Sequence, residues 1–192
     1  MGGTLIVSGS EKGRDFLTQL LLDTDAAAYQ PIQCVASGEE ARRLLSATEA
    51  ELLLINAPVI SEMGHDLATH AAQTTTAAVV LIVKAEQADD MEAQVENDGV
   101  LVLGKPFSRP CFFQTVRLAL AARRRMLGLK NENVQLQQKI EEIRLVDRAK
   151  CALIQYLGLT EPQAHRYIEK QAMDSRQTRG EVARQVIKTY EA

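Results

Sequence analysis

This chain of 192 residues contains no tryptophan, and aromatic side chains make up only 4% of it. It also lacks any apolar run approaching the roughly 18 residues that span a bilayer, so we predict no membrane segment. Thr4–Val7 already read as a strand without a basic leader before them, and we expect no secretory signal. The 3 cysteines, Cys34, Cys111 and Cys151, are far apart and lack metal-ligand spacing. These absences predict a reduced, cytoplasmic protein.

Signatures of catalysis are equally scarce. The 3 histidines, His65, His70 and His165, are scattered along the chain. Neither a nucleophile motif nor a glycine-rich phosphate loop is present. We therefore expect no enzymatic activity, no cofactor and no bound metal.

Charge is distributed unevenly along the chain. Residues 1–122 carry 8 Lys and Arg against 16 Asp and Glu, a net charge of -8, whereas residues 123–192 carry 14 against 9, a net charge of +5. This polarity indicates an acidic input half and a basic output half. Taken alone, a surplus of +5 is better explained by a chance difference in charge between ordinary solvated helix faces.

The first half alternates between short apolar runs and amphipathic segments. The runs are too short for ordinary helices and too apolar for exposed loops, so they predict strands. The predicted strands are Leu5–Val7, Ile32–Val35, Leu52–Ile55, Val79–Val83 and Val100–Leu103, and the predicted helices are Arg14–Leu22, Glu39–Ala47, His65–Ala72 and Ala88–Glu96. In the first helix, Phe16, Leu17, Leu20 and Leu21 share one apolar stripe. This alternation predicts an α/β fold with a five-stranded parallel, flavodoxin-like sheet covered by helices on both faces.

The carboxyl ends of the predicted strands are where function lies in such a sheet. Lys105-Pro106-Phe107 after the fifth strand resembles the Lys-Pro signature of response-regulator receiver domains. A receiver also needs acidic Mg²⁺ ligands after its first strand, a phosphoacceptor aspartate after its third and a hydroxyl after its fourth. Here those positions hold Ser8-Gly9-Ser10, Asn56 and Lys84. Residues 1–122 thus resemble a pseudo-receiver with a degenerate site formed by Ser8, Asn56, Lys84 and Lys105.

From Arg109 the pattern becomes continuously helical, and residues 109–145 predict a connector that overlaps the last receiver helix. Met126, Asn133 and Ile140 fall at heptad position a, and Leu129, Leu136 and Ile143 fall at position d. This seam of three heptads predicts a parallel homodimer through a coiled coil, with the polar Asn133 favouring two strands. The alternative is a single amphipathic helix packed on its own chain.

The last third predicts a small three-helix bundle over residues 138–192. Gly158 ends the long helix, and Thr160–Gln163 and Thr178–Glu181 begin two further helices with capping boxes. The first of these boxes has a proline in the first helical turn, a strong start signal. The apolar stripe expected from the long helix comprises Ile143, Val146, Ala149, Leu153 and Leu157.

These residues resemble the ANTAR domain, the RNA-binding module of transcription antitermination regulators. The matching segments are Asp147–Lys150, Gly158–Glu161, Ala164, Ala172–Met173 and Val182–Ala183. The sequence departs from the family at Cys151, where glycine is usual, at His165, where an aromatic is usual, and at Glu169, where arginine is frequent. A receiver or pseudo-receiver joined to this module by a helical connector is the family's usual layout.

The resemblance implies a dimer that binds two hairpins of a nascent leader transcript and prevents a terminator from forming. Basic side chains would contact phosphates, while amides, hydroxyls and small residues would meet bases exposed in RNA loops. The candidate RNA-binding residues are Arg148, Lys150, Gln171, Ala172, Ser175, Arg176 and Arg179. For Tyr167 and Met173 we favour core packing over RNA contact.

Two other functions remain open. A three-helix module can resemble a helix-turn-helix, which would make this a DNA-binding transcriptional regulator, although no recognition helix is evident. Alternatively, the chain is a protein-interaction adaptor, with a sensor or regulatory protein bound to the pseudo-receiver. Because Asn56 lacks a carboxylate, we expect phosphodonors to leave dimerisation and RNA affinity unchanged.

Overall fold

The computed structural model describes residues 3–25, 27–60 and 62–190. They divide into two compact units between Leu127 and Gly128, and each unit is described by itself.

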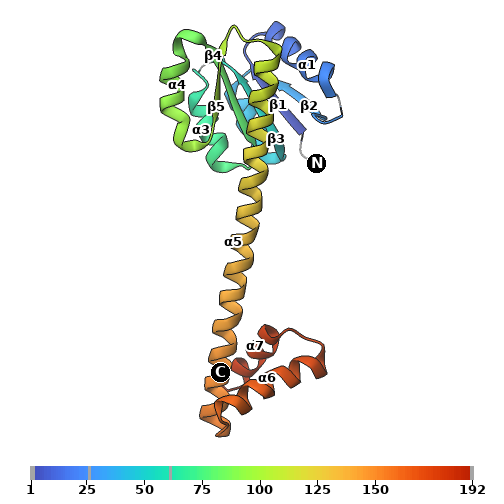
Figure 1. The fold of residues 1–192 in the computed structure, drawn as a ribbon, viewed down its shortest axis with the longest axis vertical. Coiled ribbons are helices and arrows are strands. Elements are labelled where there is room, and N and C mark those ends of the chain that lie inside the picture. The colour runs from blue at the N-terminus through green and yellow to red at the C-terminus, as the bar shows by residue number, and fades with distance from the viewer. Residues whose placement is uncertain (1–2, 26, 61, 191–192) are drawn as a thin grey trace. The chain divides into compact units, whose positions relative to one another are not determined.

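The first unit contains a five-stranded parallel sheet with the strand order β2-β1-β3-β4-β5 (Figure 1). Its strands are β1 (Gly3–Ser8), β2 (Ile32–Val35), β3 (Ala50–Asn56), β4 (Ala78–Lys84) and β5 (Leu101–Lys105). The register aligns Ser8 with Asn56 and Lys84 with Lys105. These side chains therefore meet at the carboxyl edge of the sheet, as expected for a receiver-like topology.

Apolar side chains cover both faces of this sheet. Helices α2 (Gly38–Ala47), α3 (His65–Thr74) and α4 (Ala88–Val95) contribute to the core on one face. Helix α1 (Glu11–Asp25) and the first turns of α5 (Arg109–Leu157) contribute to the core on the other. Neighbouring strand residues alternate between the two cores, because successive side chains of a strand point to opposite faces. The predicted α/β fold with helices on both faces is confirmed.

The predicted apolar stripe of α1 is correct in three of its four members. Leu17, Leu20 and Leu21 are fully buried, whereas Phe16 is 55% exposed. The Phe16 ring instead lies near Phe107, with 6.3 Å between the ring centroids. Two segments of 3-10 helix, Ala85–Gln87 and Glu96–Asp98, flank α4.

Helix α5 has 49 residues, which confirms the long helix predicted from Arg109 to Leu157. Phe112, Val116 and Ala119 in its first turns are buried against the sheet. Among the described residues, no helix is both long and apolar enough to cross a membrane.

The second unit packs the end of α5 against α6 (Glu161–Ser175) and α7 (Arg179–Tyr190). Its core is built from small and branched side chains, namely Ala149, Ala152, Leu153, Ala164, Ile168, Ala172, Val182, Ala183 and Val186. Gly158 after α5 has φ of 65°, in the left-handed region that favours glycine. Thr160 with Gln163 and Thr178 with Glu181 form the two predicted capping boxes.

Two residues of the predicted α5 stripe lie outside this core. Ile143 is 60% exposed and Leu157 is 46% exposed, so their assignment to the bundle core was wrong. Helices α6 and α7 pack on the side of α5 that carries Ala149 and Leu153. At 100° per residue, Ile143 lies about a third of a turn away from Ala149 around the helix.

Candidate nucleic-acid interface and receiver-like site

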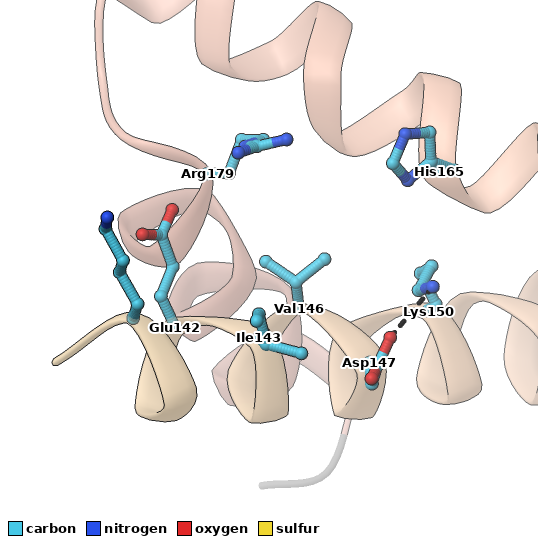
Figure 2. Close-up of a pocket in the computed structure, with 8 residues that line it drawn as sticks. Glu142, Ile143, Val146, Asp147, Lys150, His165 and Arg179 are labelled. Carbon is cyan, nitrogen blue, oxygen red and sulfur yellow. Dashed lines mark ion pairs between the residues drawn. The ribbon is translucent and has the colours of Figure 1, made fainter. Parts of the chain in front are cut away.

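A hollow of about 430 Å³ lies within the second unit (Figure 2). His165 of α6 and Arg179 at the start of α7 lie across it from the side chains of α5. Its lining consists of Lys139, Glu142, Ile143, Val146, Asp147, Lys150, His165 and Arg179. The hollow thus combines basic, acidic and apolar groups.

Lys150, one of the predicted RNA contacts, is held by two carboxylates of its own chain. Its Nζ lies 2.8 Å from Asp147 Oδ1 and 3.0 Å from Glu161 Oε1. The hydrogen bonds that Lys150 donates, first to Asp147 and then to Glu161, raise the pKa of Lys150 above its usual range. Its side chain is only 16% exposed. Lys150 therefore ties α5 to the first turn of α6, and two carboxylates offset its positive charge.

A second hollow, of about 420 Å³, lies beside the end of α6. It is lined by Glu169, Ala172, Met173, Gln177 and Arg179. Ala172 is 8% exposed and belongs to the core of the second unit. Arg179 lines both hollows.

The expectation of core packing for Tyr167 and Met173 is wrong. Met173 is 73% exposed and Tyr167 is 37% exposed. Each neighbours a core residue in sequence, Ala172 or Ile168, and the 100° step between successive helical residues turns its side chain toward solvent. Met173 consequently presents an apolar surface at the second hollow.

The turn between α6 and α7 displays two arginines. Arg176 ends α6 in the left-handed conformation with φ of 54°, and its side chain is exposed. Ser175 Oγ donates to the Gln171 carbonyl at 2.6 Å, so this hydroxyl already has an internal acceptor. The Glu181 carboxylate accepts hydrogen bonds from the Thr178 backbone and hydroxyl, and these bonds lower the pKa of Glu181. The cap fixes the position at which Arg179 begins α7.

The predicted RNA-binding residues are only partly brought together. Arg179 joins Lys150 at the first hollow and Ala172 at the second. Gln171, Ser175 and Arg176 are exposed within about the last turn of α6 and its cap, whereas Arg148 is exposed on α5 and lines neither of these hollows. His165 and Glu169 were not among the predicted RNA-binding residues, and His165 Nε2 lies 3.2 Å from Glu169 Oε1. Their i,i+4 spacing on a helix was the available signal.

At the carboxyl edge of the first unit's sheet, Asn56 links Ser8 to Lys105. Asn56 Nδ2 donates to Ser8 Oγ at 3.0 Å, and Lys105 Nζ donates to Asn56 Oδ1 at 2.9 Å. Lys105 also donates to the Ala57 carbonyl at 2.7 Å. Burial, and secondly the charge of Lys84, lower the pKa of Lys105. Within the described ranges, no group of three or more His, Cys, Asp and Glu residues is arranged to hold a metal.

The predicted heptad seam is exposed along its length. The exposed fractions are 47% for Met126, 58% for Leu129 and Leu136, 51% for Ile140 and 60% for Ile143. Asn133 is exposed as well. A single chain thus leaves a row of apolar side chains in water.

Residues 134–187 match the family model of the ANTAR domain. The chain is also similar to the transcriptional regulatory protein PdtaR from two strains of Mycobacterium tuberculosis. Each relative is 30% identical over 161 residues, which cover 84% of this chain and 78% of the relative.

Solved receiver domains resemble the first part of the chain. One is the signal receiver domain of an HD domain-containing protein from Pseudomonas fluorescens, with a TM-score of 0.58 and 21% identity over 66% of this chain and 92% of that one. Another is a CheY-like receiver domain protein from Methanospirillum hungatei, with a TM-score of 0.55 and 14% identity over 66% of this chain and 98% of that one. At these identities the likeness establishes the fold alone.

Proposed function

This chain belongs to the ANTAR-domain transcriptional regulators that carry a receiver-like domain, and from that premise we propose that it is an RNA-binding antiterminator. It acts in the cytoplasm as a homodimer, binds two hairpins of a nascent leader transcript and keeps a terminator from forming. It performs no catalysis of its own.

The observation that carries this proposal is the position of Arg179 between two hollows. Sequence-specific proteins read RNA mainly at unstacked loop bases, because side chains cannot enter the deep groove of an A-form helix. Each hollow is large enough for a base, and Arg179 lines both. A guanidinium in this position can contact the phosphate between two bases and can also stack on one of them.

Neighbouring groups extend this surface in two directions. Arg176, Gln171 and Ser175 supply a cation, an amide and a hydroxyl around the end of α6. Met173 supplies exposed apolar area, and the small Ala172 lies in the lining of the second hollow. Lys150 supports the surface by joining α5 to α6, and its contribution to phosphate binding is smaller than that of Arg179.

The exposed seam of α5 supports a dimer. Leu129, Leu136 and Ile140 would be covered when two copies of α5 pair in parallel, and Asn133 would fix their register. Two RNA-binding modules held in one dimer make the second hairpin contact intramolecular, which raises the overall affinity.

Input to this regulator is independent of aspartyl phosphorylation in our proposal. Asn56 presents an amide at the phosphoacceptor position and is already bonded to Ser8 and Lys105. An amide has no carboxylate oxygen to attack a phosphodonor, and Ser8 supplies no carboxylate for Mg²⁺.

Competition between labelled leader RNA and duplex DNA of the same sequence tests the choice of nucleic acid. We expect unlabelled leader RNA to displace the labelled RNA and duplex DNA to compete poorly. The affinity for RNA should fall steeply as the salt concentration rises. Equal competition by DNA would favour the DNA-binding regulator. Failure to bind either nucleic acid at low salt would favour the protein-interaction adaptor.

A further inference from the structure

A hollow of about 260 Å³ opens at the carboxyl edge of the first unit's sheet. Asn56 and Lys105 supply its polar groups, and Phe16, Leu17, Pro106 and Phe107 supply its apolar ones. Phe16 is 55% exposed and is not needed to fill the core, yet its ring lies near that of Phe107. A hollow lined by aromatic side chains and a few polar groups is typical of a small-molecule site.

Hydrogen-bond donors in this hollow exceed the acceptors that the chain offers them. The Lys105 ammonium has three donors, and Asn56 Oδ1 and the Ala57 carbonyl use two of them. Because lysine can only donate, the Asn56 oxygen must face Lys105 and the Asn56 amide nitrogen must face Ser8. That nitrogen has two donors, and Ser8 Oγ uses one. Within the described residues, one N–H of each side chain therefore has no acceptor from the chain, and both residues line the hollow.

Positive charge at the same place is not neutralised by the protein. Lys84 lies opposite Lys105 in the register of β4 and β5. In the part of the chain that the structure describes, neither lysine forms an ion pair with a carboxylate. The lowered pKa of Lys105 reflects this combination of burial and a neighbouring like charge. A bound anion would offset both.

We propose that this hollow binds a small aromatic carboxylic acid, whose carboxylate accepts from Lys105 and Asn56 while its ring packs against Phe16 and Phe107. Two carboxylate oxygens match the two remaining donors. The size also fits, since a cavity of about 150 Å³ is enough for benzene and the remaining volume accommodates the carboxylate. Inorganic phosphate would satisfy the donors but would leave the aromatic walls in water.

Titration of the full-length protein with benzoate tests this site without any RNA. Isothermal calorimetry gives the dissociation constant, and amide chemical shifts of residues 56, 105 and 107 locate the ligand. Benzamide has the same shape without the charge, and inorganic phosphate has charge without the ring. We expect saturable benzoate binding at millimolar concentration or below, with benzamide and phosphate each at least about tenfold weaker.

Two variants separate the contribution of the Lys105 charge to benzoate binding from that of the Phe16 ring. Lys105→Met removes the ammonium and should weaken benzoate binding by about tenfold to a hundredfold, the effect of one charge-assisted hydrogen bond. Phe16→Ala removes an exposed ring, so the fold should persist even if Lys105→Met disturbs it, and we expect binding to weaken by about threefold to tenfold. Lys12→Met is the matched control, because it removes an exposed ammonium that does not line the hollow.

Several results would overturn the proposal. They are the absence of saturable benzoate binding up to about 10 mM, equal binding of benzoate and benzamide, equal binding of benzoate and phosphate, or Phe16→Ala binding benzoate as the unmodified protein does. None of these outcomes bears on RNA binding by the second unit.

Discussion

Replacement of Arg179 by alanine should separate RNA binding from stability. Arg179 is exposed at the first position of α7, and among the described residues it forms no ion pair or side-chain hydrogen bond. A cation near a helix N-terminus opposes the helix dipole by roughly 0.3–1 kcal/mol. Removal of the guanidinium should therefore leave the free energy of unfolding unchanged or raise it by a few tenths of a kcal/mol.

The loss in RNA affinity should be much larger. One hydrogen bond to a charged group contributes about 1.5–3 kcal/mol, which corresponds to roughly tenfold to a hundredfold in the dissociation constant. If Arg179 contacts a phosphate, the plot of log affinity against log salt should also become less steep, by the slope that corresponds to about one phosphate contact. Fluorescence anisotropy with a single labelled hairpin, repeated at several salt concentrations, measures both quantities.

Arg184→Ala provides the matched control for this experiment. Arg184 is exposed on the same helix but lines neither hollow of the second unit. We expect this control to weaken hairpin binding by less than about threefold. If Arg179→Ala and Arg184→Ala weaken hairpin binding equally, a general electrostatic attraction explains the data. The proposal that RNA binds at the two hollows lined by Arg179 is then refuted.

Further predictions concern the ion pairs of Lys150, the heptad seam of α5, the capping box at Glu181 and the degenerate receiver site at Asn56. Lys150→Met should destabilise the protein by about 1–2 kcal/mol, because Asp147 and Glu161 lose their partner. Calorimetry should then show a Tm lowered by several degrees. An unchanged Tm would contradict a stabilising role of Lys150. Leu136→Lys should shift the protein toward monomer in analytical ultracentrifugation, whereas Val134→Lys, also exposed on α5 but outside the seam, should leave the dimer intact. Glu181 has a lowered pKa in the folded state, so its contribution to stability is present above its usual pKa of 4.5 and is lost as pH falls below it. Urea unfolding at decreasing pH should therefore show a smaller loss of stability for Glu181→Gln than for the unmodified protein. Acetyl phosphate with Mg²⁺ should not phosphorylate the Asn56→Asp variant, because Ser8 still supplies no carboxylate ligand for the metal. Stoichiometric labelling would show that the aspartate was the only group missing for phosphorylation.

Local patterns predicted much of the fold. Alternation of short apolar runs with amphipathic segments predicted the five strands and their covering helices, because burial on both faces leaves a continuous apolar signature. Gly158, Thr160 and Thr178 predicted the ends of the last helices, because capping depends on residues only a few positions apart.

Contacts between distant residues could not be predicted in the same way. The hydrogen bond from Lys150 to Glu161 depends on how the chain turns after Gly158, and it gives Lys150 a structural contact beside its predicted contact with RNA. Exposure of Met173 and Ile143 depends on which side of each helix packs inward, and the residue type alone favours burial at both positions. The link from Asn56 to Ser8 and Lys105 requires the sheet register, although the three residues were already suspected from their places after the strands.

The central claim is that one dimer captures two RNA hairpins, and a comparison of three RNAs tests it most directly. Binding is measured at one salt concentration to a two-hairpin leader and to each of its hairpins alone. Because the second contact is intramolecular, we predict that the two-hairpin leader binds about a hundredfold or more tighter than either hairpin, and that Leu136→Lys abolishes the difference. Equal affinity for all three RNAs would contradict the account.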